Sequence, residues 1–82
     1  MKSEARQSRV PKDILKSLRK ANKGRLYKIR MRKVRSEAYP QFYHYEWRIV
    51  SPEGKTEEGG LKDKGIDALN EAVHRRWRRF GD

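Results

Sequence analysis

The 82-residue sequence contains no cysteine and no long run of apolar residues. Without cysteine there are no disulfide bonds and no thiolate metal sites, which fits a reducing compartment. A membrane-spanning helix needs roughly 20 consecutive apolar residues, so none is expected. Residues 1–10 start with a basic group but lack the apolar centre of a secretory signal. These absences predict a cytoplasmic or nucleoid-associated protein.

The usual signs of a catalytic centre are also missing. His44 and His74 are far apart in the sequence, and no nucleophile motif, metal-ligand spacing or phosphate-binding loop occurs. Asp67 and Glu71 are one helical turn apart, but they fit a solvated helix face. We therefore expect no enzyme activity, no cofactor and no metal.

Positive charge is abundant and uneven. The formal net charge is +11, and residues 1–36 hold 14 lysines and arginines against two acidic residues. A second basic cluster near the C-terminus comprises Arg75, Arg76, Arg78 and Arg79. Such asymmetry favours a nucleic acid or another anionic surface as partner over charge that serves only solubility.

The length permits a single small domain. Residues 1–10 lack apolar periodicity and predict a flexible basic arm, followed by one domain over residues 11–82. Pro11 and the spacing of Ile14, Leu15, Leu18 and Ala21 predict a helix over residues 11–22, with Gly24 as its stop.

Two segments alternate apolar and charged residues, which is typical of strands with one face buried. They cover residues 25–35 and 42–51. The inward set is Tyr27, Ile29, Met31, Tyr43, Tyr45, Trp47 and Ile49. The outward set is Lys28, Arg30, Arg32, His44, Glu46 and Arg48.

The rest of the chain predicts a turn, an edge strand and a helix. Pro52 and Gly54 favour the turn, and residues 55–61 suit an edge strand. Asp63 is placed to cap the final helix. Its apolar stripe is Ile66, Leu69, Ala72, Val73, Trp77 and Phe80. The fold class is therefore α+β: a small three-stranded antiparallel sheet packed on a C-terminal helix, with a short N-terminal helix.

The outward cations are the first candidate site. Lys28, Arg30, Arg32 and Arg48 would stand side by side, with His44 in support, and like charges on neighbouring strands repel. An anion at this face would offset that cost. In the alternative, the face is solvated or covered by the N-terminal helix. Glu46 could pair with a neighbouring arginine or accept from cytosine N4.

The basic arm is the second candidate, with Arg6, Arg9 and Lys12 on a DNA backbone or in a minor groove. A solvated tail and helix face explain the same residues nearly as well. Most aromatic residues fall on the inward face and predict core packing, whereas Tyr39 and Phe42 remain free to stack on bases.

A run from Phe42 to Phe80 resembles a known family. An aromatic strand (FYHYEWRI) is followed by a Pro-x-Gly-Lys turn (SPEGK), a short strand ending in Gly-Leu (EEGGL) and an amphipathic helix. This order resembles the N-terminal arm-site DNA-binding domain of lambda-type phage integrases and the similar ethylene-response domain of plants. The resemblance implies a three-stranded sheet that enters the DNA major groove and a basic tail that adds contacts.

The sequence thus favours a module that binds double-stranded DNA through a basic sheet face and a basic arm. One alternative is a small protein, such as a phage-encoded factor, that binds and modulates an acidic surface of a host enzyme or nucleoprotein complex. The other is a protein that binds structured RNA. The oligomeric state stays open.

Overall fold

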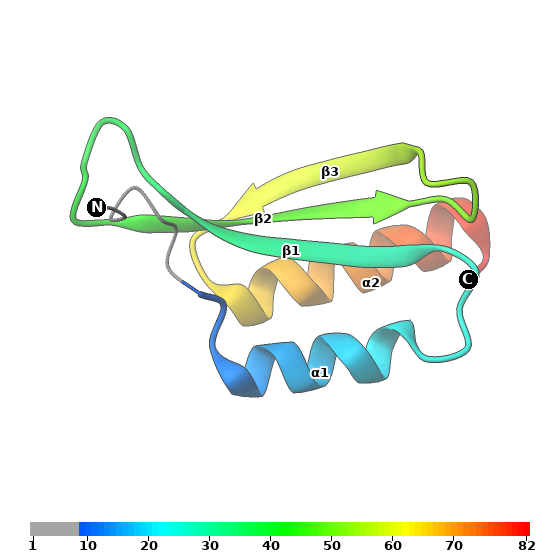
Figure 1. The fold of residues 1–82 in the computed structure, drawn as a ribbon. Coiled ribbons are helices and arrows are strands. Elements are labelled where there is room, and N and C mark those ends of the chain that lie inside the picture. Colours follow the sequence, from blue (N-terminus) through cyan, green and yellow to red (C-terminus); the bar gives the residue numbers. More distant parts are fainter. Residues whose placement is uncertain (1–8) are drawn as a thin grey trace.

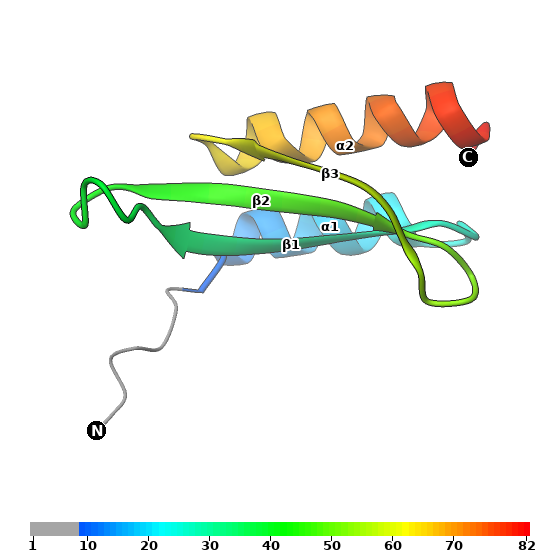
Figure 2. The same cartoon turned by 90° about the horizontal axis from the view of Figure 1, so that it is seen from above.

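A computed structural model describes residues 9–82 and contains five elements in the order helix, three strands, helix. They are α1 (Lys12–Asn22), β1 (Lys28–Arg35), β2 (Tyr43–Val50), β3 (Thr56–Lys62) and α2 (Gly65–Phe80). The strands form one antiparallel sheet in the order β1-β2-β3, and both helices lie on the same side of it (Figures 1 and 2). The predicted α+β class is confirmed, and each predicted element exists within a few residues of its expected bounds.

The register of the sheet follows the alternation of the sequence. Ile29 lies opposite Ile49 and Met31 opposite Trp47, so the apolar positions of β1 and β2 share one face. The turn between β2 and β3 is closed by Ser51, whose N–H donates to the Lys55 carbonyl at 2.8 Å. Gly54 takes a φ of 91° in this turn, a conformation that favours glycine.

The core lies between the inward face of the sheet and α2. Ile29, Trp47 and Ile49 are fully buried there against Ala68, Leu69 and Ala72 of the helix. The indole of Trp47 lies over Gly60 of β3, where an added Cβ would come within 2.8 Å of the ring. Gly60 therefore makes room for the largest side chain of the core.

The position of α1 excludes one of the alternatives for the cationic face. The alternative that placed α1 over that face is wrong, because α1 lies beside α2 on the opposite side (Figure 1). Its apolar stripe points toward β1 and α2, where Leu18 and Ala21 pack against the core. This placement lets a helix with no fully buried residue share an existing apolar layer.

The predicted start and inward face of α2 need correction. The helix begins at Gly65 with Lys64 as its N-cap, and no side chain caps it. Its buried positions are Gly65, Ala68, Leu69, Ala72 and Arg76, whereas Trp77 is 64% exposed. The small residues among these allow the helix to approach the sheet closely, which turns Trp77 and Ile66 outward.

Candidate nucleic-acid interface

The face of the sheet opposite the helices, called the open face below, carries the predicted cations. None of the elements within residues 9–82 covers it (Figures 1 and 2). By register it comprises Lys28, Arg30, Arg32 and Val34 of β1, His44, Glu46, Arg48 and Val50 of β2, and Gly59 and Leu61 of β3. The side chains that the alternation predicted to face outward together do so.

Arg30 and Arg48 form the centre of this face. They are directly opposite each other in the β1–β2 register, and both are exposed. No carboxylate within the described residues forms an ion pair with either of them. Like charges at facing positions weaken strand pairing, so this pair lowers the stability of the sheet unless an anion joins it.

The other two cations already have partners on the protein. Arg32 donates from Nε to Oε1 of Glu46, the residue opposite it on β2. Lys28 donates from Nζ to the Asn22 carbonyl at 3.0 Å. Glu46 thus takes the internal pairing that the sequence left open, and Arg30 with Arg48 remains the pair most available to a ligand.

His44 lies at the end of the open face and contacts Asp63, which was expected to cap the final helix. Its Nδ1 lies 3.2 Å from Oδ1 of Asp63. The prediction that Asp63 caps α2 is therefore wrong, because the helix starts one residue later than this cap requires and the carboxylate turns to the histidine. The imidazole is partly exposed and still accessible from the open face.

Apolar side chains accompany the cations. Val34 and Val50 are half-buried on the open face, and Leu61 of β3 is 60% exposed. The sequence pattern did not indicate Leu61, because the glycines before it hide the alternation of β3. Such side chains can contact thymine methyl groups in a major groove or apolar groups of a protein.

The predicted arm is only partly described. Arg6 lies outside the described residues, whereas Arg9 and Lys12 are exposed. Val10 is buried, so the packed part of the chain extends to residue 10. Lys12 begins α1 on the helix side of the sheet, so it does not form one flat surface with Arg30 and Arg48 (Figure 1).

Tyr39 and Phe42 are the exposed aromatic residues that sequence left free to stack. They are 61% and 58% exposed in the connection between β1 and β2, with ring centroids 6.2 Å apart in an edge-to-face contact. The other aromatic expectations hold for the strands, since Trp47 is buried and Tyr27 stacks on Phe80 at 4.3 Å.

The four arginines of the second basic cluster do not form one free basic surface, because Arg76 is buried. Arg76 is 1% exposed, and its guanidinium donates to the carbonyls of Ala21 at 2.7 Å and Tyr27 at 3.0 Å, and to Asn22 Oδ1 at 3.2 Å. Burial lowers the pKa of Arg76, and attraction to the Asp82 carboxylate opposes that shift. This arginine ties α2 to α1 and to the start of β1.

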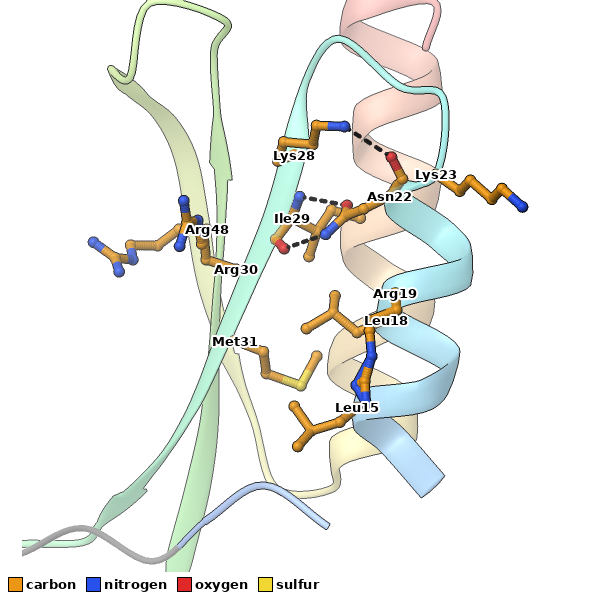
Figure 3. A pocket seen from close by; sticks show the side chains of 10 residues that line it. All are labelled: Leu15, Leu18, Arg19, Asn22, Lys23, Lys28, Ile29, Arg30, Met31 and Arg48. Carbon is orange, nitrogen blue, oxygen red and sulfur yellow. Dashed lines mark hydrogen bonds between the residues drawn. The ribbon is translucent and has the colours of Figure 1, made fainter. Parts of the chain in front are cut away.

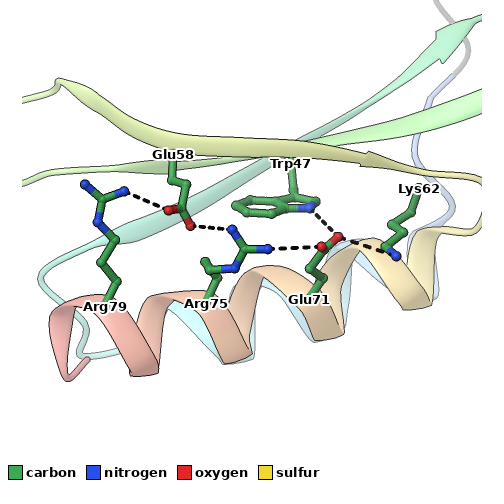
Figure 4. Close-up of polar contacts among 6 residues, drawn as sticks. All are labelled: Trp47, Glu58, Lys62, Glu71, Arg75 and Arg79. Atoms are coloured by element: carbon green, nitrogen blue, oxygen red, sulfur yellow. Dashed lines mark hydrogen bonds and ion pairs between the residues drawn. The ribbon is translucent and has the colours of Figure 1, made fainter.

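Its neighbours are also engaged. Arg75 and Arg79 donate to the two carboxylate oxygens of Glu58 on β3, at 3.1 and 2.7 Å (Figure 4). Arg75 also reaches Glu71, which accepts the indole N–H of Trp47 at 3.1 Å. The expectation that Glu71 is merely solvated is therefore wrong, and Arg78 alone of the four is exposed with no ion pair among the described residues.

The two arginines determine the acidity of Glu58. Burial by itself would raise the pKa of this carboxyl group, but the hydrogen bonds from Arg79 and Arg75 outweigh it and hold the pKa below its ordinary value. The ion pairs of Glu58 with Arg75 and Arg79 therefore connect β3 to α2 at neutral pH.

No protein-family model, curated protein sequence or solved structure matches this chain significantly. The resemblance to arm-site domains of integrases therefore stays a prediction. Neither helix of the described residues is long and apolar enough to cross a membrane.

Proposed function

We propose that the protein binds double-stranded DNA, with the open face of the sheet against the duplex. The observation that carries the proposal is the facing pair Arg30 and Arg48, exposed, uncovered by either helix and without an ion pair among the described residues. A pair of arginines that repel each other gains most from a ligand with closely spaced negative charges, such as a phosphate backbone.

The shape of the face supports the same ligand. A major groove about 12 Å wide admits a two-stranded ribbon, and the cations of the open face lie on the two paired strands β1 and β2, with both helices behind them. Arg30 and Arg48 would contact phosphates or guanine edges, Lys28 and Arg32 would add contacts on either side, and His44 would assist at one end. The exposed Arg9 and Lys12, together with Arg6 of the sequence, would reach the flanking backbone.

The test is a titration of fluorescent duplex DNA followed by anisotropy. Four phosphate contacts predict a roughly hundredfold loss of affinity between about 50 and 200 mM salt. Replacing both Arg30 and Arg48 by alanine should lower the affinity about a hundredfold and reduce the salt slope by about two.

A matched control removes two other exposed cations, with Lys55→Ala and Arg78→Ala in one chain. This control has the same net charge as the double variant at the open face, and it should keep most of the affinity. Equal losses in the two variants, or binding that ignores salt, would contradict a defined contact surface. Tighter binding of an RNA duplex of equal length would assign the face to RNA instead.

A second function, binding to an acidic surface of a protein, is favoured by Leu61, which is exposed among the cations of the open face. Apolar and arginine side chains together are common at the centre of protein interfaces. Leu61→Ser should then abolish capture of the partner, and nuclease treatment should leave that capture intact.

A further inference from the structure

β1 is an edge strand, and its hydrogen bonds show which backbone groups face the free edge. The Ser36 N–H donates to the Phe42 carbonyl at 3.0 Å, which continues the pairing with β2 at even-numbered positions. At odd-numbered positions the backbone groups point the other way. The N–H and C=O of Ile29 both form hydrogen bonds with the side chain of Asn22 in α1, away from β2. The N–H and C=O of Met31 and Lys33 therefore point to the free edge as well.

Side chains form hydrogen bonds with the edge-facing backbone groups only in the first half of this edge. The Tyr27 N–H donates to Asp82 Oδ2 at 2.9 Å, and the Tyr27 carbonyl accepts from Arg76. Ile29 donates to Asn22 Oδ1 at 2.8 Å and accepts from its Nδ2 at 2.9 Å. Within residues 9–82, the edge-facing backbone groups of Met31 and Lys33 form no such hydrogen bonds. The edge of β1 therefore keeps unpaired N–H and C=O groups at these two residues, with which another strand could pair.

A groove of about 830 Å³, called the edge groove below, runs along this part of β1 (Figure 3). Its apolar lining comes from Leu15 and Leu18 of α1 and from Ile29 and Met31 of β1. The side chains of Leu15, Leu18 and Met31 point into the space between the helix and the strand and are only half-buried. The groove therefore offers apolar surface next to unpaired backbone groups.

The polar lining of the edge groove is entirely basic or neutral. It comprises Arg19, Asn22, Lys23, Lys28, Arg30 and Arg48. Arg19 and Lys23 lie on the helix side, whereas Arg30 and Arg48 lie on the open face around the edge of β1. Of the described residues, no carboxylate lines the groove, so an occupant would meet only positive charge.

An extended peptide that alternates apolar and acidic residues would complement the unpaired backbone groups of β1, the apolar lining of the edge groove and its positive charge. Its backbone would pair with Met31 and Lys33, and alternate side chains would point to opposite faces. The apolar set would enter the edge groove, and the acidic set would lie toward Arg30 and Arg48. A second copy of this chain does not fit because of its +11 charge.

We propose that an acidic, apolar-alternating segment of a partner protein adds to β1 as a fourth strand beside α1. This inference does not rest on the proposed binding of DNA. The two ligands would share Arg30 and Arg48, so they would exclude each other where both bind.

The test is an NMR titration of the ¹⁵N-labelled protein with a blocked heptapeptide that alternates glutamate with valine and leucine. We expect shifts at Met31 and Lys33, slower hydrogen exchange of their amides, and no change at Thr56 or Leu61 near the other edge of the sheet. The same peptide with N-methyl groups on alternate residues should bind at least about tenfold more weakly, because it cannot form the ladder.

Paired charge reversals on α1 and at its C-cap Lys23 locate the site without touching the core. Arg19→Glu with Lys23→Glu should weaken peptide binding about tenfold or more, whereas Lys16→Glu with Lys20→Glu, exposed on the same helix with the same charge change, should have a much smaller effect.

The proposal is overturned if about 1 mM peptide causes no shift, if the N-methylated peptide binds equally well, or if the two charge reversals act alike. It is also overturned if duplex DNA, and not the peptide, perturbs the methyl groups of Leu15 and Leu18, since the groove would then belong to a nucleic acid. Slowed exchange of the Met31 and Lys33 amides together with the difference between the helix variants would establish it.

Discussion

The arginines of β1 and β2 and those of α2 look equivalent in the sequence and have opposite surroundings in the fold. Arg30 and Arg48 face each other on an uncovered surface and form no ion pair among the described residues. Arg75 and Arg79 share Glu58, and Arg76 is buried among backbone carbonyls. A count of basic residues therefore does not identify a candidate binding surface, because paired cations are already engaged within the protein and unpaired cations stay available to a ligand.

The difference has a physical cause. The inward positions of β3 place Glu58 beside the last turns of α2, so the positive charge there is neutralised locally. The open face holds one such carboxylate, Glu46, which occupies Arg32 and leaves the central pair exposed. Loss of a paired or buried arginine should therefore reduce stability, and loss of an unpaired one should not.

The largest effect should come from Arg76→Ala. The change removes a buried guanidinium and leaves the carbonyls of Ala21 and Tyr27 without a donor in the interior. We expect a loss of about 3 kcal/mol or more in the free energy of unfolding. Urea unfolding measures it, with the exposed Arg78→Ala as control, and similar midpoints for the two variants would refute the structural role of Arg76.

A smaller, pH-dependent effect should follow from Glu58→Gln. Because the pKa of Glu58 lies below its ordinary value of 4.5 in the folded state, its ion pairs stabilise the fold above that pH and are lost as the pH falls through the folded pKa. The substitution should cost about 1 kcal/mol at neutral pH, a modest value because Arg75 and Arg79 are partly exposed.

Unfolding midpoints at neutral pH and at an acidic pH below the folded-state pKa of Glu58 provide the measurement. The gap between wild type and Glu58→Gln should close at the acidic pH, because the carboxyl group is protonated below its folded-state pKa. Glu53→Gln, in the exposed turn before β3, is the control and should differ little from wild type at either pH. A gap that stays constant would show that the ion pairs contribute nothing that depends on pH.

The smallest effect should come from Arg30→Thr, and its sign should be reversed. Threonine favours strands and ends the repulsion with Arg48, so the free energy of unfolding should rise by about 0.5 kcal/mol. The same variant should bind DNA less tightly if the open face is the contact surface. Thermal unfolding at low salt gives the first quantity, and a clear loss of stability would contradict the view that this pair exists for a ligand.

The strands were the most predictable part of the fold. Alternation over Tyr27–Met31 and Tyr43–Ile49 determines which side chains share a face, and a register that buries both Met31 and Trp47 must turn Arg30 and Arg48 outward. For the same reason, the alternation alone is enough to indicate the main candidate site. Leu61 was not predicted to lie on this face, because the two glycines before it interrupt the alternation of β3.

The helices were less predictable. Of the apolar stripe predicted for α2, Leu69 and Ala72 are buried and Val73 and Phe80 pack against the core, whereas Ile66 and Trp77 face outward and Arg76 takes an inward position. Only the assembled fold brings the carbonyls of Ala21 and Tyr27 to one place and gives a buried arginine its acceptors. The contact of Asp63 with His44 was not predictable either, because the two residues are distant in the sequence.

The sequence by itself determined the two faces of the sheet, because side-chain direction in a strand alternates with every residue and depends on nothing beyond the neighbouring positions. The tertiary structure alone decided that α1 joins α2 on one side, that three C-terminal arginines are engaged, and that half of the β1 edge stays open. These outcomes depend on which distant groups meet in space, and a local pattern carries no such information.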